Sequence, residues 1–259
     1  MKKIILSLCV WFIATSSSLA QSLPHFQIMT EDWFPYQFYE GTELRGISVD
    51  LMDEMLKRVG SSQTRSDIQL FPWARAYHLV RKKEHTVLFS MTRTTEREKQ
   101  FRWVGPIFQN TTYLITLKKK NIKISSSKDL EHYRFGTIRD DASEIFLSRL
   151  GVNQNRFYRN STTKSNLRLL HSGRIDFIVS GQDAFESDIK LTGLNPDDFE
   201  AVFIADVSKI WIAFYRDTED WIIQKFQKSL DDIKDEGVYD QIFMKYGEEA
   251  KNPEALMIN

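Results

Sequence analysis

Short apolar strands alternate with amphipathic helices along this chain, and this alternation restricts its fold more than any other feature of the sequence. Residues 26–29, 68–71 and 86–89 are expected strands. Apolar residues at helical spacing predict helices over residues 51–59, which Ser48 or Asp50 can cap, and from residue 73 onward. Strands that alternate with helices predict α/β layers with mainly parallel strands.

A second unit of the same kind follows a polar connection at residues 118–127. Its expected strands are residues 134–138 and 177–179, with helices marked by Ala142–Leu150 and Leu167–His171. An extended apolar segment and two helices end the chain. Two such units predict two lobes joined by two hinge crossings, with lobe 1 at residues 22–109 plus 206–259 and lobe 2 at residues 110–205. Ligands in such folds bind outside the carboxyl ends of the strands.

Residues 1–20 have the features of a targeting segment. A basic start at Lys2 and Lys3 precedes an apolar run, and the segment ends with a small-x-small pattern at Ala20. The run is too short to favour a membrane span, although an uncleaved anchor is the alternative. We therefore expect cleavage after Ala20 and a periplasmic protein. Cleavage would remove Cys9, the only cysteine, so the mature chain is expected to have no disulfide or thiolate site.

The charge balance and the placement of the histidines argue against nucleic-acid binding and against a histidine metal site. The chain has 35 basic and 35 acidic residues, and loss of Lys2 and Lys3 leaves a formal charge of −2. Such a balance argues against a nucleic-acid binder, which needs a basic surface. The five histidines are scattered and form no metal-ligand spacing. We expect no cofactor, no metal and a monomer.

The segment from Ser90 to Arg97 is the strongest candidate for a binding site. It follows an apolar strand, and Ser90 and Thr92 are two residues apart, so both hydroxyls can point the same way from an extended backbone. Arg97 could hold a planar anion, most simply a carboxylate, by a bidentate grip. A polar strand-to-helix turn with a surface arginine is the alternative. Three other arginines could add a second grip, although surface exposure is their default: Arg75, Arg93 and Arg139.

Five segments in order resemble those of the family 3 extracellular solute-binding proteins. These are two-lobed periplasmic receptors of ABC importers, typically for polar amino acids. The resemblance covers the chain from about Phe26 to Gly247. The matching segments are Trp33-Phe34-Pro35-Tyr36, residues 44–51, residues 92–97 with Phe101 and Gly105-Pro106, Ser172-Gly173-Arg174-Ile175-Asp176, and Asp235-Glu236-Gly237-Val238-Tyr239.

The resemblance implies roles for five residues. Arg97 would bind the α-carboxylate of the ligand, helped by Ser90 and Thr92. Trp33 stands where the family places an aromatic ring against the ligand, and Trp73 lies close to the expected second aromatic wall. The segment around Trp73 is unlike that of typical amino-acid receptors.

Two departures from the family pattern concern lobe 2. The family usually has a carboxylate that holds an α-ammonium where this chain has Gly181, with Asp183 two residues later. Asp140 and Asp141 replace a Gly-Thr pair at a helix start. A carboxylate there suits the helix dipole but repels a ligand carboxylate, so Asp141 could instead hold a cationic group.

The expected function is capture of a small polar, carboxylate-bearing ligand for delivery to an ABC importer. One alternative is a ligand sensor for a membrane kinase or chemoreceptor. A second is a dehydratase-like enzyme on the same scaffold, which would need a cleft acid or base. Four carboxylates are available for that role, but each is also explained as an exposed acid: Asp141, Glu144, Asp183 and Glu186.

Overall fold

The computed structural model describes residues 22–249, apart from the side chains of Gln182 and Asp183. The expected targeting segment, with Cys9 and the cleavage position after Ala20, lies outside the described residues. Within residues 22–249, no helix has the length and apolar character needed to cross a bilayer.

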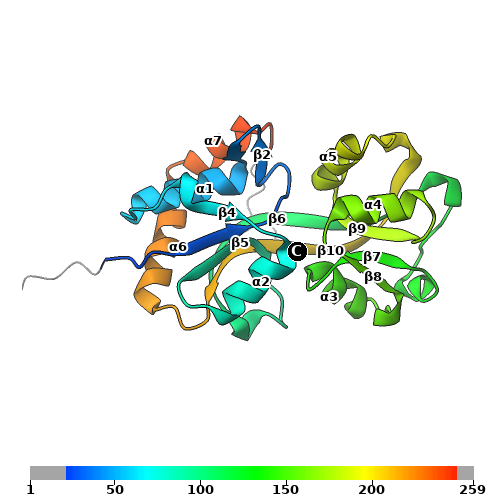
Figure 1. The fold of residues 1–259 in the computed structure, drawn as a ribbon, viewed down its shortest axis with the longest axis horizontal. Helices are drawn as coiled ribbons and strands as arrows, with labels where there is room; N and C mark the ends of the chain where they lie inside the picture. The colour runs from blue at the N-terminus through cyan, green and yellow to red at the C-terminus, as the bar shows by residue number, and fades with distance from the viewer. Residues whose placement is uncertain (1–21, 250–259) are drawn as a thin grey trace, which may run out of the picture.

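The molecule has two lobes that share one eight-stranded sheet (Figure 1). The strand order is β4-β1-β5-β10-β6-β9-β7-β8. β1, β4 and β5 pair in parallel in the first lobe, and β7 pairs in parallel with β8 and β9 in the second. The predicted two-lobe α/β fold is thereby confirmed. The strands are β1 (Gln27–Thr30), β4 (Ile68–Leu70), β5 (Thr86–Thr92), β7 (Phe135–Ile138), β8 (Phe157–Asn160) and β9 (Phe177–Gly181).

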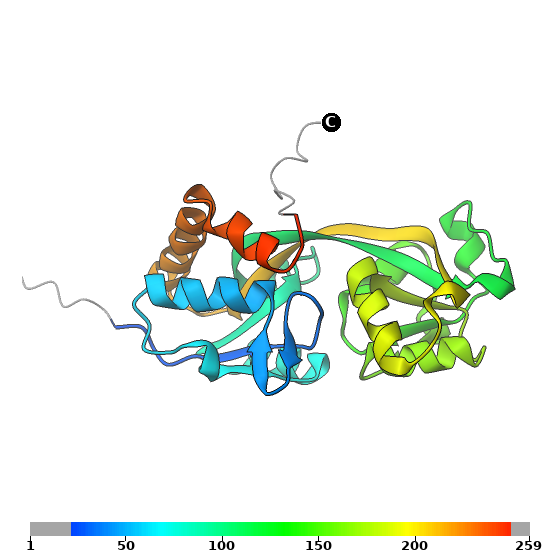
Figure 2. The same ribbon diagram turned by 90° about the horizontal axis from the view of Figure 1, so that it is seen from above.

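Helices cover both faces of the sheet in each lobe (Figures 1 and 2). Those of lobe 1 are α1 (Ile47–Arg58), α2 (Trp73–Lys82), α6 (Asp220–Asp235) and α7 (Val238–Lys245), beside the hairpin β2 (Phe38–Glu40) and β3 (Glu43–Arg45). Those of lobe 2 are α3 (Ala142–Arg149), α4 (Thr163–His171) and α5 (Gln182–Thr192). Short 3-10 turns connect the elements at η1 (Arg65–Asp67), η2 (Glu98–Gln100), η3 (Lys118–Lys120), η4 (Ser127–Leu130), η5 (Gln154–Arg156) and η6 (Pro196–Asp198).

Two long strands cross from one lobe to the other. β6 (Phe101–Leu117) and β10 (Phe199–Tyr215) pair in antiparallel register along their length, with Phe199 opposite Leu117 and Tyr215 opposite Phe101. The expected lobe boundaries, at residues 109/110 and 205/206, fall inside these two strands. Because both crossings belong to one ladder, they can only bend together.

Each lobe has its own apolar core on either side of the sheet. In lobe 1, one cluster lies under α1 and α6 and a second lies under α2. In lobe 2, one cluster lies under α4 and α5 and the other under α3. Separate cores allow the lobes to move as rigid bodies about the crossings.

Helix α1 begins differently from its prediction. Its N-terminal cap is Gly46, with no side-chain capping bond, so Ser48 and Asp50 lie inside the helix. Gly46 has φ 125°, and a Cβ at this position would lie 2.3 Å from the carbonyl oxygen of Tyr36. Only glycine fits this close approach, which holds the 33–37 loop against the start of α1.

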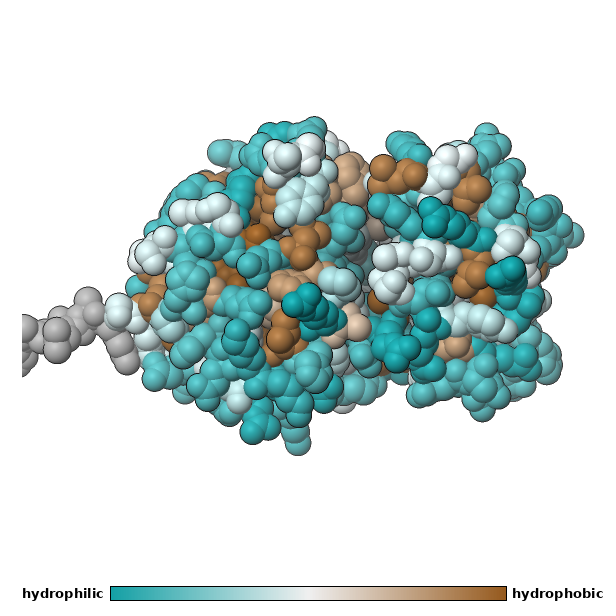
Figure 3. Space-filling model, in the orientation of Figure 1, coloured by the Kyte–Doolittle hydropathy of each residue, from teal (hydrophilic) through white to brown (hydrophobic). Residues whose placement is uncertain are grey.

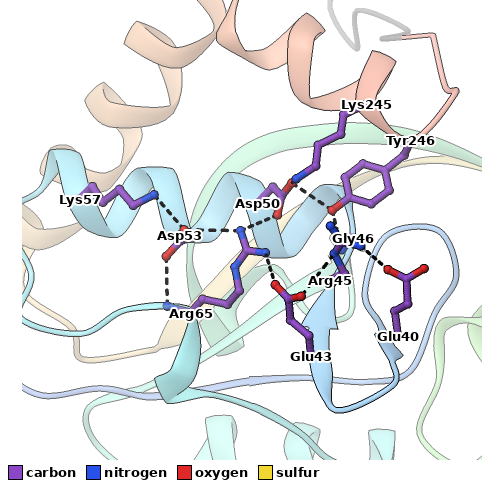
Figure 4. A network of polar contacts seen from close by, with 10 residues as sticks. All are labelled: Glu40, Glu43, Arg45, Gly46, Asp50, Asp53, Lys57, Arg65, Lys245 and Tyr246. Carbon is purple, nitrogen blue, oxygen red and sulfur yellow. Dashed lines mark hydrogen bonds and ion pairs between the residues drawn. The ribbon is translucent and has the colours of Figure 1, made fainter.

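Asp50 ties the end of the chain to lobe 1 (Figure 4). Its buried carboxylate accepts hydrogen bonds from Arg65 at 2.6 Å, Lys245 at 2.6 Å and the Tyr246 hydroxyl at 3.0 Å. The Tyr246 oxygen in turn accepts from the backbone N–H of Gly46 at 3.0 Å. One carboxylate therefore joins α1, η1 and the end of α7.

Candidate ligand-binding site

A cavity of about 450 Å³ lies between the lobes, at the carboxyl ends of β1 and β5 and beside the starts of α3 and α5. Figure 3 shows the surface hollowed between the two lobes. Every residue proposed from the sequence for the site lines it: Trp33, Trp73, Ser90, Thr92, Arg97 and Asp141. The structure therefore brings the proposed residues together at one place.

Arg97 is the largest fully buried side chain of the described protein, at 1% exposure. Its guanidinium lies 5.2 Å from the Trp73 ring and 4.9 Å from the Tyr77 ring, so two aromatic faces hold it in place. Nη1 donates to the Thr92 carbonyl at 3.1 Å and Nη2 to the Asp140 carbonyl at 2.8 Å. The buried Nε has no hydrogen-bond partner among the described residues.

That N–H leaves one donor of the Arg97 guanidinium without an acceptor among the described residues. A buried donor without a partner costs about 1–3 kcal/mol, and a guanidinium donor belongs to the costly end. A carboxylate in the cavity would remove this cost and balance the buried charge. The Arg97 geometry therefore supports binding of an anionic group.

Trp73 lines the cavity and also contacts lobe 2. It is buried, stacks on Tyr77 with ring centroids 5.7 Å apart, and its Nε1 donates to the Asp140 carbonyl at 3.0 Å. The Asp140 carbonyl thus accepts from two lobe-1 side chains, Trp73 and Arg97. Asp140 itself has φ 62°, a left-handed conformation that aspartate tolerates better than most residues.

Ser90 and Thr92 differ in how they face the cavity. Ser90 has φ 64°, so the extended backbone assumed in the prediction turns at this residue. Its hydroxyl donates to Gln37 Oε1 at 2.8 Å and lies 3.0 Å from the hydroxyl of Ser48, and its proton is therefore already used within lobe 1. Thr92 ends β5 at the cavity and holds Arg97 through its carbonyl.

Trp33 lines the cavity but also belongs to the lobe-1 core. Its ring lies 5.0 Å from that of Tyr36 and 5.8 Å from that of Phe108, while Tyr36 and Phe108 stack at 3.9 Å. A substitution at Trp33 is therefore expected to lower stability as well as binding.

Asp141 caps α3. Its carboxylate accepts from the backbone N–H of Ser143 at 2.9 Å, which fixes the first turn of the helix. The same carboxylate lines the cavity and raises the pKa of Glu31 across the cleft.

Glu31 is the functional candidate that the sequence analysis missed. It follows β1, lines the cavity and is half-buried, and desolvation raises its pKa well above the usual range. The carboxylates of Asp141, Asp32 and Asp188 raise the pKa further, and Arg97 opposes them. These acids come from β1, α3 and α5, so no local pattern in the sequence joins them.

Asp188 extends this acidic region along α5. Burial raises its pKa to about 6, with a further contribution from Asp32 that Lys164 and a hydrogen bond from Thr163 oppose. Lys164 of α4 lies 3.9 Å from Asp32 across the cleft. The cavity wall thus carries four carboxylates and two cations: Glu31, Asp32, Asp141, Asp188, Arg97 and Lys164.

Several side-chain contacts join the two lobes. Besides the two bonds to the Asp140 carbonyl, Arg149 of α3 forms a two-point ion pair with Glu96, with contacts of 2.7 and 3.3 Å. These contacts and the Lys164–Asp32 pair all join lobe 1 to lobe 2.

Other residues considered from the sequence lie elsewhere. Arg75 and Arg139 are exposed and do not line the cavity, and Arg93 pairs with Glu98 behind the site. Gly181 lines the cavity without a side chain. In the described part of the chain, no group of three or more His, Cys, Asp or Glu residues is placed to hold a metal ion.

Comparisons with known proteins show the family of the chain. Residues 27–249 match the family described as bacterial extracellular solute-binding proteins, family 3. The chain is 25% identical to a probable histidine-binding protein of Campylobacter jejuni, over 82% of this chain and 80% of that protein. It is 26% identical to the arginine-binding extracellular protein ArtP of Bacillus subtilis, over 95% and 98% of the two chains.

A solved structure shares the fold. The arginine-, lysine-, histidine-binding protein ArtJ of Geobacillus stearothermophilus matches with a TM-score of 0.75 at 17% identity, over 88% of this chain and 97% of that one. The resemblance stated from the five sequence segments is confirmed by these matches.

Proposed function

The chain belongs to the family 3 bacterial extracellular solute-binding proteins, and we propose that it captures an amino acid with a cationic side chain. The observation that carries this proposal is the charge of the cavity wall, which has Arg97 for an anionic group and four carboxylates nearby. Such a wall favours a ligand that has one carboxylate and an excess of positive charge.

Each part of the ligand has a partner in this arrangement. The carboxylate binds the Arg97 guanidinium, whose Nε has no acceptor within residues 22–249. A cationic group binds among Glu31, Asp141 and Asp188, whose mutual repulsion it relieves. Trp33 and Trp73 form apolar walls beside these groups.

The relatives support a cationic ligand. The two relatives of similar sequence are named as histidine-binding and arginine-binding proteins, and the solved relative is named as an arginine-, lysine-, histidine-binding protein. Histidine, lysine and arginine share an α-carboxylate and a side chain that can carry positive charge. All three relatives are named as binding proteins, which supports a receptor rather than an enzyme.

The ligand would be enclosed by closure of the lobes. We place the hinges in β6 and β10, at residues 109/110 and 205/206, where the two crossings pass between the lobes. The mature protein, cleaved after Ala20, would work in the periplasm and present its closed form to the permease of an ABC importer.

A thermal-shift screen of the mature chain tests this proposal. A ligand that binds only the folded state raises the melting temperature by mass action. The panel contains arginine, lysine, histidine, glutamine, glutamate and the polyamine spermidine. We expect shifts with the cationic amino acids alone. Shifts with glutamate but not arginine would contradict the proposed charge preference, and shifts with spermidine alone would contradict the carboxylate grip of Arg97.

A further inference from the structure

The mouth of the cavity is apolar on both lobes. On lobe 1, Phe34 and Tyr39 line the cavity and remain 43% and 56% exposed, and Phe38 lies between them with its ring 4.9 Å from that of Phe34. On lobe 2, Leu191 at the end of α5 lines the same cavity and is 66% exposed. We call Phe34, Phe38, Tyr39 and Leu191 the mouth residues.

The mouth residues face one another across the cleft. Figures 1 and 2 both place β2 and the loop before it opposite α5. In Figure 3, apolar residues (brown) lie on the rim of the hollow over α5. A single exposed leucine or tyrosine is common on protein surfaces. Several exposed apolar side chains around one opening instead indicate a surface that binds an apolar group.

The cavity is large enough for a ligand of drug-like size. Its volume of about 450 Å³ lies within the range of pockets that enclose drug-sized ligands, roughly 300–1,000 Å³. A ligand that filled only the charged part would leave the mouth residues in water. The volume therefore leaves room for a further group on the ligand.

The remaining lobe-2 wall is neutral. Asn110, Thr112 and Ser180 line the cavity with amide and hydroxyl groups, and Gly181 has no side chain to offer. A Cβ at Gly181 would lie 2.9 Å from Asn110 Oδ1, so this wall leaves little space for a carboxylate side chain there. Neutral donors and acceptors pair well with an amide, whereas a free ammonium is better held by an acid.

We propose that the mouth residues form an outer subsite for an apolar acyl group, so that the ligand is a cationic amino acid acylated on its α-nitrogen. This inference rests on the proposed function. Because Arg97 holds the carboxylate and the acids hold the side chain, only the α-nitrogen is free to carry an extension. A dipeptide with an apolar first residue and arginine as its second has this chemistry.

Three probes separate the subsite from the charged site. L-Arginine, Nα-acetyl-L-arginine and Nα-benzoyl-L-arginine are titrated calorimetrically into the mature protein. The two acyl forms have the same charge and differ in an aromatic ring. We expect the benzoyl form to bind about tenfold more tightly than the acetyl form, since burial of one aromatic face corresponds to roughly that factor.

Variants of the mouth residues test whether these residues bind the acyl group. In Tyr39→Ala with Leu191→Ala, the preference for benzoyl over acetyl should fall below about threefold while arginine binds as before. Tyr158→Ala with Met244→Ala is the matched control, because both side chains are exposed and neither lines the cavity. This control should keep the full preference.

The outcomes distinguish the two proposals. If arginine binds and the benzoyl form binds no more tightly than the acetyl form, the outer subsite is wrong and the proposed function stands. A preference that survives the loss of Tyr39 and Leu191 also overturns the subsite. Failure of all three probes to bind contradicts the proposed function, and the subsite with it.

Discussion

Arg97 is the residue on which the account of the cleft depends. It is fully buried, its Nη atoms donate to carbonyls from both lobes, and its Nε has no acceptor in the described part of the chain. A charge buried in this way is stable only if a ligand anion or a carbonyl dipole balances it. The side chain is therefore arranged for an anion before the ligand arrives.

Replacement of Arg97 tests this arrangement. We expect Arg97→Ala to weaken binding of a cationic amino acid by about a hundredfold or more, because the ligand carboxylate is then buried without its partner. Calorimetry measures the loss. Arg93→Ala is the matched control, since Arg93 pairs with Glu98 and does not line the cavity. Equal affinities of the Arg97 and Arg93 variants would show that Arg97 does not hold the ligand.

Asp188 gives binding a pH dependence with a definite sign. Its pKa is raised to about 6 in the unliganded protein, so this group stabilises the fold most below about pH 4, and the contribution is lost as pH rises through 6. A cationic ligand favours the ionised carboxylate. Affinity should therefore rise between about pH 5 and 7, with protons released on binding near pH 6.

Calorimetry in buffers of different ionisation enthalpy detects this proton release. Asp188→Asn should reduce both the release and the slope of affinity against pH, and Glu31, whose pKa is also raised, accounts for what remains. A flat affinity between pH 5 and 7 in the wild-type protein would exclude a role for these acids in holding the ligand.

The sequence indicates the proposed partner of an anionic group more readily than the proposed partners of a cationic group. Arg97 lies in the short segment from Ser90 to Arg97 that follows a strand, so a local sequence pattern is enough to indicate it. Glu31 and Asp188 meet only because the fold brings β1 and α5 together, so no local spacing reveals them. The expected geometry of Ser90 failed because the backbone turns left-handed there, which turns its hydroxyl to Gln37.

At the scale of elements, the end of α7 depends on Asp50. Asp50→Ala removes the carboxylate partner of Lys245 and the acceptor of the Tyr246 hydroxyl. It also removes the 2.6 Å contact of Arg65, which keeps only longer contacts with Asp53 at 3.5 Å and Glu43 at 3.8 Å. We expect a loss of about 1–3 kcal/mol in the free energy of unfolding, measured with urea, and faster hydrogen exchange in α7.

Asp232→Ala is the control for that change. Asp232 pairs with Lys228 one turn away on the exposed face of α6, and such pairs contribute little. Its stability should stay close to that of the wild-type protein. If both variants unfold at the same urea concentration as the wild type, the Asp50 network does not hold α7.

Helices α1 to α4, α6 and α7 were predicted from the sequence, whereas helix α5 and the hairpin β2–β3 were missed. Helices α2 and α6 bury one continuous stripe, so the sequence shows them clearly. The hairpin β2–β3 has three residues in each strand and is largely exposed, and α5 turns polar residues to the cavity. The missed elements carry three of the mouth residues, Phe38, Tyr39 and Leu191, together with Asp188. The sequence therefore did not indicate the outer part of the proposed site.

At the scale of the molecule, contacts between the lobes stabilise closure even without ligand. The Arg149–Glu96 pair is about half exposed, so its expected contribution is about 0.2–1 kcal/mol, which is at most a fivefold shift toward the open form. Arg149→Ala should increase the radius of gyration of the unliganded protein in small-angle scattering and weaken binding by less than about fivefold.

Asp220→Ala is the control for closure. Asp220 pairs with Arg102 within lobe 1, so its loss should leave the radius of gyration unchanged. An unliganded Arg149→Ala protein that scatters like the wild type would mean that this ion pair does not bias the lobes toward closure.

The central claim is that the cleft binds a cationic amino acid through Arg97 and the opposing carboxylates. Its most direct test compares L-arginine with L-citrulline by calorimetry on the mature protein, because the two have nearly the same shape and differ in the charge of the side chain. We predict that arginine binds at least about tenfold more tightly, since the carboxylates pair only with a charged group. Equal binding of citrulline, or binding of neither, would contradict the claim.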